Sequence, residues 1–198
     1  MSSKRAGQAS KLQHKNGKLR IIAGEWRGRK LPIFSLDGLR PSGDRTRETL
    51  FNWLQADIVK AHCADLFAGT GALGFEALSR GATHVEFVEN HAKVAALLGE
   101  NTSLLQAQAK VNSCTAEHFL ATYSGPAFDL VFIDPPFAAN LWQATFTAIN
   151  KNHLLVSEAL VYVEAPAESI PAIPENWSVE KSKKIGAVQA ILARVHFP

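Results

Sequence analysis

DLFAGTGALGFEA, residues 65–77, is the most informative stretch of this 198-residue chain. Its first residues are apolar enough to end a strand. Gly69, Gly71 and Gly74 then spell GxGxxG in a tight turn, and the residues that follow favour a helix. Glu89 stands at the expected end of the next strand. Such a unit binds adenosine cofactors, because the helix N-terminus offers free N–H donors and the acid accepts from ribose hydroxyls.

Short apolar runs and helical stretches alternate along the rest of the chain. We expect strands at 63–67, 84–88, 109–113, 128–133 and 159–163, with helices near 71–80, 91–105, 115–122 and 138–150. This alternation predicts an α/β fold with a doubly wound, mostly parallel sheet covered on both faces. Residues 177–197 leave no room for a crossover helix, so we expect an antiparallel strand pair at one sheet edge, turning at 184–186.

The N-terminal third is expected to extend this unit. Residues 1–18 read as a basic flexible tail, and residues 19–60 as a small β-hairpin followed by a helix from about Asp44 to Val59. The expected apolar stripe of this helix consists of Leu50, Phe51, Leu54 and Ile58. Its candidate N-cap is Ser42 or Asp44. We expect residues 61–198 to form the catalytic domain, in one compact unit with 19–60.

The glycine motif suits two cofactors, NAD and S-adenosylmethionine. Asp65 lies four residues before Gly69, where its carboxylate is placed to interact with a cationic amino-acid group. S-adenosylmethionine carries an ammonium and a sulfonium, whereas the anionic pyrophosphate of NAD is poorly served by an acid there. The sequence therefore favours S-adenosylmethionine, and NAD remains the alternative.

IDPPF, residues 133–137, ends another apolar strand in a carboxylate, two prolines and an aromatic ring. The prolines remove two N–H donors and stiffen the turn, so carbonyl oxygens and the Asp134 carboxylate face the site as acceptors. Acceptors on an exocyclic amine orient it and favour attack as positive charge builds on nitrogen. Phe137 offers a face for a planar base, so the element indicates an amine methyltransferase acting on nucleobases.

Charge is unevenly distributed. Residues 1–50 hold twelve Lys or Arg and four acids, whereas the rest of the chain holds nine and fourteen. This basic end suits a polyanion such as nucleic acid, although it also suits a solvated tail. Cys63 and Cys114 form no CxxC, so we expect neither a zinc site nor a disulfide framework. The absence of an apolar run of membrane or signal-peptide length leads us to expect a cytoplasmic protein without membrane contact.

In motif order the chain resembles class I methyltransferases with a Rossmann-like fold, and more narrowly the bacterial RsmD family. The resemblance begins near Arg20 and covers most of the chain. The matching blocks are RIIAGEWRGRKL (20–31), LRPSGDRTRETLFNWL (39–54), DLFAGTGALGFEALSRGA (65–82), VFIDPPF (131–137) and ALVYVE (159–164). The first two blocks are the most specific to that family. The resemblance implies methylation of the exocyclic N2 of a guanine in 16S ribosomal RNA, with S-adenosylmethionine as cofactor.

The resemblance also implies roles for individual residues. Those that line or hold the cofactor would be Asp65, Phe67, Gly69, Gly71 and Glu89, with Thr115 and Ala116 flanking the adenine. Related enzymes commonly have an Asp where Thr115 stands. Asp134 and the Pro135 carbonyl would hold the guanine amine, and Phe137 would pack on the base.

Basic residues outside the motifs have two interpretations each. The candidates for RNA contact are Arg27, Arg29, Arg40, Arg45 and Arg47. The last three are also placed to help close the cofactor site, or instead suit a solvated helix face with charge pairs, Asp44 with Arg47 or Glu48 with Arg45. Trp26 suits base stacking or, more simply, packing within the hairpin. Five histidines, at 62, 84, 91, 118 and 153, have no partner at useful spacing, so we assign them no role and no metal.

We expect a monomer that acts on 16S ribosomal RNA within an assembled small subunit. The sequence leaves open another amine acceptor (adenine N6 in DNA or RNA, or a protein glutamine), a non-catalytic assembly factor, and an NAD-dependent oxidoreductase.

Overall fold

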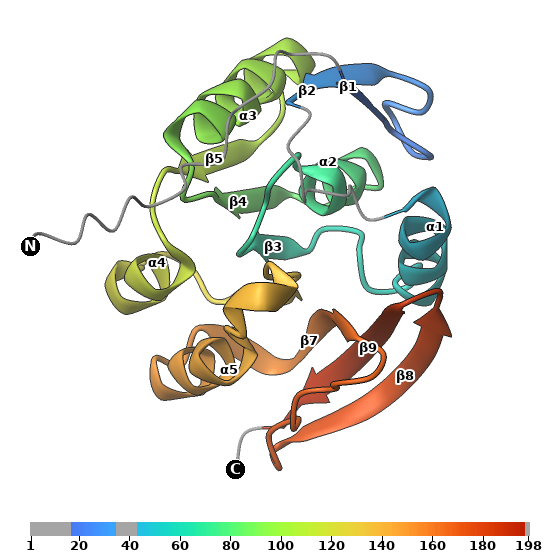
Figure 1. Ribbon diagram of the computed structural model, residues 1–198. Helices are drawn as coiled ribbons and strands as arrows, with labels where there is room; N and C mark the ends of the chain where they lie inside the picture. Colours follow the sequence, from blue (N-terminus) through green and yellow to red (C-terminus); the bar gives the residue numbers. More distant parts are fainter. Residues whose placement is uncertain (1–16, 35–42, 197–198) are drawn as a thin grey trace, which may run out of the picture.

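The central feature of the computed structural model, which describes residues 17–34 and 43–196, is a seven-stranded sheet with the order β5-β4-β3-β6-β7-β9-β8 (Figure 1). Its strands are β3 (His62–Asp65), β4 (His84–Val88), β5 (Ala109–Asn112), β6 (Phe128–Ile133), β7 (Leu155–Pro166), β8 (Trp177–Ile185) and β9 (Val188–Val195). The first five strands in this order run parallel, and β9 and β8 are antiparallel to their neighbours. The predicted doubly wound sheet with an antiparallel edge is confirmed.

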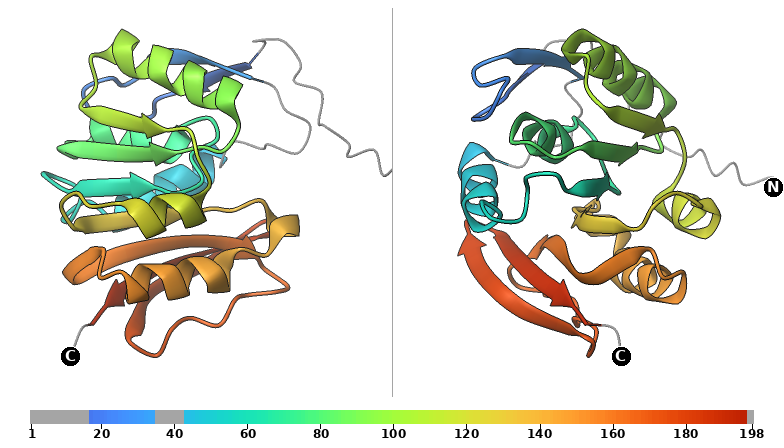
Figure 2. Two further views of the ribbon diagram at one scale, coloured as in Figure 1. Left: turned by 90° about the vertical axis from the view of Figure 1, so that its left-hand side faces the viewer. Right: turned by 180° about the vertical axis from the view of Figure 1, so that it is seen from behind.

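Helices cover both faces of the sheet (Figures 1 and 2). They are α1 (Asp44–Trp53), α2 (Ala72–Ser79), α3 (Ala92–Leu105), α4 (Ala116–Thr122) and α5 (Trp142–Lys151), with a short 3₁₀ turn η1 (Phe137–Ala139). Apolar residues of α1, α2 and α3 form one core cluster, and those of α4 and α5 form a second on the opposite face. Strands between two such layers are buried on both sides, which explains the nearly continuous apolar run FDLVFI in β6.

Strands β3 and β7 differ in length from the prediction because their residues also form the glycine turn or pair with a further strand. β4 and β6 have the predicted bounds, whereas β3 ends at Asp65, two residues early, because the following residues form the glycine turn. β7 is longer than predicted because its C-terminal half also pairs with β9. The β8–β9 turn lies at Gly186, which has a φ of +63°, and Ala187; the predicted turn at 184–186 starts too early, because Lys184 and Ile185 still belong to β8.

The N-terminal segment forms the expected hairpin, β1 (Gly17–Arg20) and β2 (Lys30–Ile33), and then α1. The predicted helix to Val59 is wrong in its end: α1 stops at Trp53, and the chain continues in tight turns up to Lys60, which has a φ of +68°. These turns reverse the chain into β3. The predicted apolar stripe is nevertheless buried, namely Leu50, Phe51, Leu54 and Ile58. The N-cap is Gly43 without a side-chain bond; Asp44 is the first helical residue, and Ser42 lies outside the described residues.

The hairpin is fastened to α2 by hydrogen bonds from its backbone. Glu76, fully buried, accepts from the N–H groups of Ile22 at 2.8 Å and Ala23 at 3.0 Å. Ser79 Oγ donates to the Ala23 carbonyl at 2.6 Å and accepts from Trp26 N at 3.0 Å. The helix that follows the glycine turn therefore also holds the N-terminal hairpin.

Among residues 17–34 and 43–196, none of the helices has the length and apolar content that a transmembrane span requires.

Candidate functional site

Three acids meet at one edge of the sheet. Asp65 ends β3, Glu89 follows β4 and Asp134 follows β6. Because β3 is the parallel neighbour of both other strands, their carboxyl ends lie together, where open α/β sheets bind ligands. Burial, chiefly, and the charges of Asp134 and Glu89 raise the pKa of Asp65 to about 7. The edge is therefore an acidic site that favours a cation over an anion.

Asp65 also serves the helix behind the turn. Its carboxylate is 3% exposed, and Oδ2 accepts from the backbone N–H of Gly74 at 3.1 Å, a bond that lowers the pKa against the effect of burial. The α2 N-cap, Gly71, has no side chain to satisfy the free N–H groups of the first turn. Asp65 supplies that acceptor from the neighbouring strand, a contact that sequence reasoning missed.

The glycine turn is braced by Glu89. Oε2 of Glu89 accepts from the Gly69 N–H at 3.0 Å and Oε1 from the His91 N–H at 2.7 Å. Gly69 and Gly71 have positive φ angles of 52° and 77°, and a Cβ on Gly71 would lie 2.5 Å from the Phe75 ring. Each carboxylate oxygen has a second lone pair, so Glu89 can brace the turn and still accept from sugar hydroxyls.

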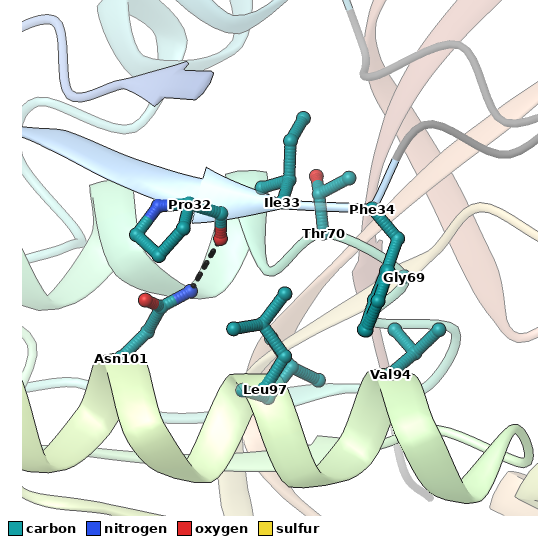
Figure 3. A pocket seen from close by; sticks show the side chains of 9 residues that line it. Pro32, Ile33, Phe34, Gly69, Thr70, Val94, Leu97 and Asn101 are labelled. Atoms are coloured by element: carbon teal, nitrogen blue, oxygen red, sulfur yellow. Dashed lines mark hydrogen bonds between the residues drawn. The ribbon is translucent and has the colours of Figure 1, made fainter. Parts of the chain in front are cut away.

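An apolar crevice adjoins the turn, between β2 and α3 (Figure 3). Its lining consists of Pro32, Ile33, Phe34, Gly69, Thr70, Val94, Leu97, Leu98 and Asn101. Asn101 Nδ2 donates to the Pro32 carbonyl at 3.0 Å, which ties α3 to the hairpin across this crevice. The sequence did not indicate that β2 contributes a wall beside the glycine turn.

The DPPF element forms a short turn after β6. Pro135 is buried, and Pro136 precedes η1. The Phe137 side chain is 38% exposed, and its ring centroid lies 5.8 Å from that of buried Trp142. Trp142 is itself fixed by a hydrogen bond from Nε1 to the Glu164 carbonyl at 2.9 Å. An aromatic ring is thus supported on one side and accessible to a ligand.

A tyrosine–glutamate pair on β7 adds to this edge. Tyr162 Oη donates to Glu164 Oε1 at 3.0 Å, with both side chains buried. Burial, then the charge and hydrogen bond of Glu164, and finally the charge of Asp134 raise the pKa of Tyr162 well above its usual value. Sequence reasoning assigned these residues no role, although ALVYVE at 159–164 places both on one face of the strand.

Thr115 and Ala116 follow β5 at the same edge. Thr115 is the N-cap of α4, and its Oγ1 accepts from the His118 N–H at 3.2 Å. Ala116 is buried, and Phe67, after β3, is half-buried. The Thr115 hydroxyl therefore holds the helix, and its proton remains available for donation.

Comparisons with known proteins place the chain in a family. The family model described as Conserved hypothetical protein 95 matches residues 19–194. A protein of Escherichia coli K12 named "Ribosomal RNA small subunit methyltransferase D" is 47% identical to this chain, over 87% of this chain and 88% of that protein. The protein of the same name in Haemophilus influenzae is 44% identical, over 90% of this chain and 95% of that protein. The chain belongs to the RsmD family. A solved structure named "Putative methyltransferase yhhF from Escherichia coli" has a TM-score of 0.83 at 45% identity, covering 92% of this chain and all of that one.

Membership of the RsmD family decides between the two cofactors of the glycine motif. The relatives are named methyltransferases, which removes the NAD-dependent oxidoreductase as an alternative. The acidic edge fits the same conclusion, because Asp65, Glu89 and Asp134 would repel a pyrophosphate and attract the cationic groups of S-adenosylmethionine.

The arginines of this RsmD-family chain fall into two groups. Arg27, Arg29 and Arg45 are exposed, and Arg40 lies outside the described residues. The assignment of Arg47 to the RNA surface is wrong, since it is 1% exposed and its Nη2 donates to Asp44 at 2.6 Å and to the Arg20 carbonyl at 3.1 Å. Of the alternative interpretation, the Asp44–Arg47 pair is confirmed, whereas the solvated helix face is wrong for Arg47, whose side chain is buried.

Trp26 and two of the histidines have contacts that decide between their interpretations. Trp26 is 8% exposed and belongs to the core cluster beneath the hairpin, which confirms packing over base stacking. The statement that no histidine has a partner is wrong for His84, whose Nε2 lies 3.3 Å from Glu86 Oε1, and for His62, its register partner on β3. The two-residue spacing of His84 and Glu86 along β4 is a local signal for their contact, whereas spacing along the chain does not reveal the pairing of His62 with His84 across adjacent strands.

Proposed function

We propose that this chain transfers the methyl group of S-adenosylmethionine to the exocyclic N2 of a guanine in 16S ribosomal RNA. The observation that carries the proposal is Asp134, in DPPF at the carboxyl end of β6, at the same edge as Asp65 and the glycine turn. The Escherichia coli relative, 47% identical, is named a small-subunit ribosomal RNA methyltransferase, which supports this polymer as substrate.

The cofactor would be held by the residues of the acidic edge. Asp65 faces the cationic amino-acid end, Glu89 accepts from the ribose, and the turn at Gly69 and Gly71 allows close backbone approach. Phe67 would line the site, and Thr115 with Ala116 would flank the adenine. S-adenosylmethionine supplies a methyl group already activated by its sulfonium, so the chain needs mainly to bind and orient.

The amine would be positioned by acceptors of the DPPF turn. The Asp134 carboxylate and the Pro135 carbonyl accept from the two N–H groups of the guanine amine, which directs its lone pair away from the base plane. Asp134 also stabilises the positive charge that builds on nitrogen before a proton leaves it. Phe137, supported by Trp142, stacks on the base; such stacking contributes about 1–3 kcal/mol.

The RNA would be held by exposed basic residues of the N-terminal region. Arg27 and Arg29 lie in the loop between β1 and β2, and Arg45 lies in the first turn of α1. Cations there neutralise phosphates and release counterions. We propose Arg40, from the sequence alone, as a further contact. A small chain with a modest basic arm cannot easily read a long RNA, so we propose as substrate an assembled small subunit whose folded RNA presents the guanine. We also propose that the chain acts as a monomer, in the cytoplasm.

The test uses labelled S-adenosylmethionine and small ribosomal subunits from a strain that lacks this gene. After digestion to nucleosides, we expect label in N2-methylguanosine. Asp134→Asn should lower the rate by about a hundredfold or more, because it removes the charge that faces the amine. The matched control is Asp129→Asn, an exposed acid near the other end of the same strand, which should leave the rate unchanged.

The other outcomes identify the alternatives. Label in N6-methyladenosine, or in protein glutamine, would assign a different amine acceptor. Cofactor binding with no label in any polymer would favour a non-catalytic assembly factor. Equal rates on protein-free 16S RNA and on subunits would contradict the assembled particle as substrate.

A further inference from the structure

A second hollow lies at the amino ends of the parallel strands, the edge opposite the acidic site. It has a volume of about 810 Å³. His62 and His84, which line it, are the first residues of β3 and β4 and stand side by side in the parallel register. Glu86 lies two residues beyond His84, on the same face of β4. Nothing in the methyl-transfer chemistry uses these three groups.

The three side chains offer ligand atoms that lie within 4.8 Å of one another. His84 Nε2 and Glu86 Oε1 are 3.3 Å apart. Two ligands on one tetrahedral zinc ion, at bond lengths of about 2.0–2.2 Å, are themselves about 3.3–3.5 Å apart. We propose that His62, His84 and Glu86 bind a divalent transition-metal ion of the zinc class.

Neighbouring groups already orient two of the ligands. His62 Nδ1 lies 3.3 Å from the Ala127 carbonyl, which can only accept, so Nδ1 carries the proton and Nε2 keeps its lone pair. Glu86 Oε2 accepts from Asn112 Nδ2 at 2.7 Å, which leaves Oε1 on the side of His84. Such outer hydrogen bonds are the usual means of fixing ligand orientation and tautomer in metal sites.

Charge and access also fit a cation. Glu86 and Asp129 contribute two negative charges to the lining of the hollow and Lys110 one positive charge. Glu86 is buried, whereas both histidines are only half-buried, so water can reach the site and complete the coordination. Two imidazoles and one carboxylate select zinc, copper, nickel or cobalt over magnesium and calcium.

The competing explanation is a purely structural cluster. The His62 ring lies 4.8 Å from the Phe128 ring and 5.3 Å from the His84 ring, so packing and a His84–Glu86 hydrogen bond could account for the arrangement. A structural cluster predicts no metal affinity, so a measurement of metal binding distinguishes it from the proposed metal site.

The experiment uses the full chain, without a histidine tag and stripped of metal by a chelator. Zinc chloride is titrated against a chromophoric competitor, and cobalt chloride is added to record the absorption of a low-symmetry Co²⁺ site. We expect one ion per chain with a dissociation constant in the micromolar range or tighter. At a hundredfold excess over that constant the melting temperature should rise by about 5–11 °C.

His62→Gln, His84→Gln and Glu86→Gln should each weaken zinc binding at least tenfold and abolish the cobalt spectrum. The matched control is His196→Gln, which removes a histidine from the exposed His196–Glu158 pair, 2.9 Å apart and separate from the three proposed ligands. Urea unfolding without metal verifies that each variant is folded. Zinc binding weaker than micromolar, or unchanged in the His62→Gln/His84→Gln double variant, would overturn the proposal. Its outcome is independent of methyl transfer, which is measured separately.

Discussion

Glu76 shows how much one buried side chain contributes to this molecule. Its carboxylate accepts hydrogen bonds from two backbone N–H groups of the hairpin segment and, at 2.8 Å, from Nε of Arg80. Arg47 Nη1 lies 3.6 Å from Glu76 Oε2. A buried charge with this many partners is stabilising only while all of them are present, because each partner left alone keeps its desolvation cost.

Glu76→Gln should therefore destabilise the protein by about 3 kcal/mol, since it removes the charge that compensates Arg47 and Arg80 and turns an amide N–H toward the backbone donors. Urea unfolding monitored by tryptophan fluorescence measures this. Glu48→Gln, at an exposed position on α1, is the control and should stay within about 0.5 kcal/mol of the parent. Equal stabilities of the two variants would contradict the role given to Glu76.

Asp65 predicts a pH dependence of stability. Its pKa is about 7 in the folded chain, against 3.8 as the ordinary value, so between these pH values the folded protein holds a proton that the unfolded chain releases. The free energy of unfolding therefore contains a favourable contribution below pH 4 that is lost as the pH rises to 7, on the order of 4 kcal/mol.

Asp65→Asn removes that contribution, because an amide does not ionise and still accepts from Gly74 N. Without cofactor, the stability of this variant relative to the parent should rise between pH 4 and pH 8, as measured by urea unfolding across this range. A difference that stays constant with pH would show that Asp65 keeps its charge on burial. With S-adenosylmethionine present, the stability of the parent relative to Asp65→Asn should increase, because the Asp65 carboxylate interacts with the cationic end of the cofactor.

At the scale of elements, the glycine turn and α2 depend on backbone conformation. Gly71 is left-handed and tightly surrounded, whereas a Cβ at Gly99, in the middle of α3, would point into open space with no neighbouring atom within 4 Å. The two glycines therefore carry opposite expectations for the same substitution.

Gly71→Ala should destabilise the chain by at least about 1 kcal/mol, because alanine is strained at a φ of +77° and its methyl group meets Phe75 and Leu98. Gly99→Ala should stabilise it by about 0.5–1 kcal/mol, since alanine favours the helix. Thermal unfolding of both variants, and cofactor binding by calorimetry, provide the measurement. If Gly71→Ala binds and melts like the parent, the turn is less constrained than its geometry indicates.

At the scale of the molecule, the hairpin and α1 share one core with the sheet. Residues of β1, β2, α1, α2 and β7 belong to the same cluster of buried side chains. We propose that residues 19–60 and 61–198 unfold together, as one cooperative unit.

Hydrogen exchange tests this. The protected amides of β1 and β2 should exchange with the same free energy as those of β3 and β6, because the hairpin cannot leave α2 without exposing Glu76 and the core beneath Trp26. Exchange of the hairpin at a free energy several kcal/mol lower would indicate a separately opening unit.

The amino-acid sequence was enough to predict the class of fold, the glycine turn, the acids at three strand ends and the antiparallel edge. These follow from local signals, namely hydrophobic period, glycine at positive φ, and polar residues directly after apolar strands. Membership of the RsmD family was also readable from the sequence, in the blocks at 20–31, 39–54 and 65–82.

Which polar groups face one another is seen only in the folded chain. Arg47 is buried with Nη1 3.6 Å from Glu76, Asp65 supplies the missing cap of α2, and His62 stands beside His84. α1 ends at Trp53 because the chain must turn back into β3. Strand register and the pairing of buried charges are set by contacts between residues far apart in the chain, so residue spacing carries no record of the His62–His84 and Arg47–Glu76 contacts.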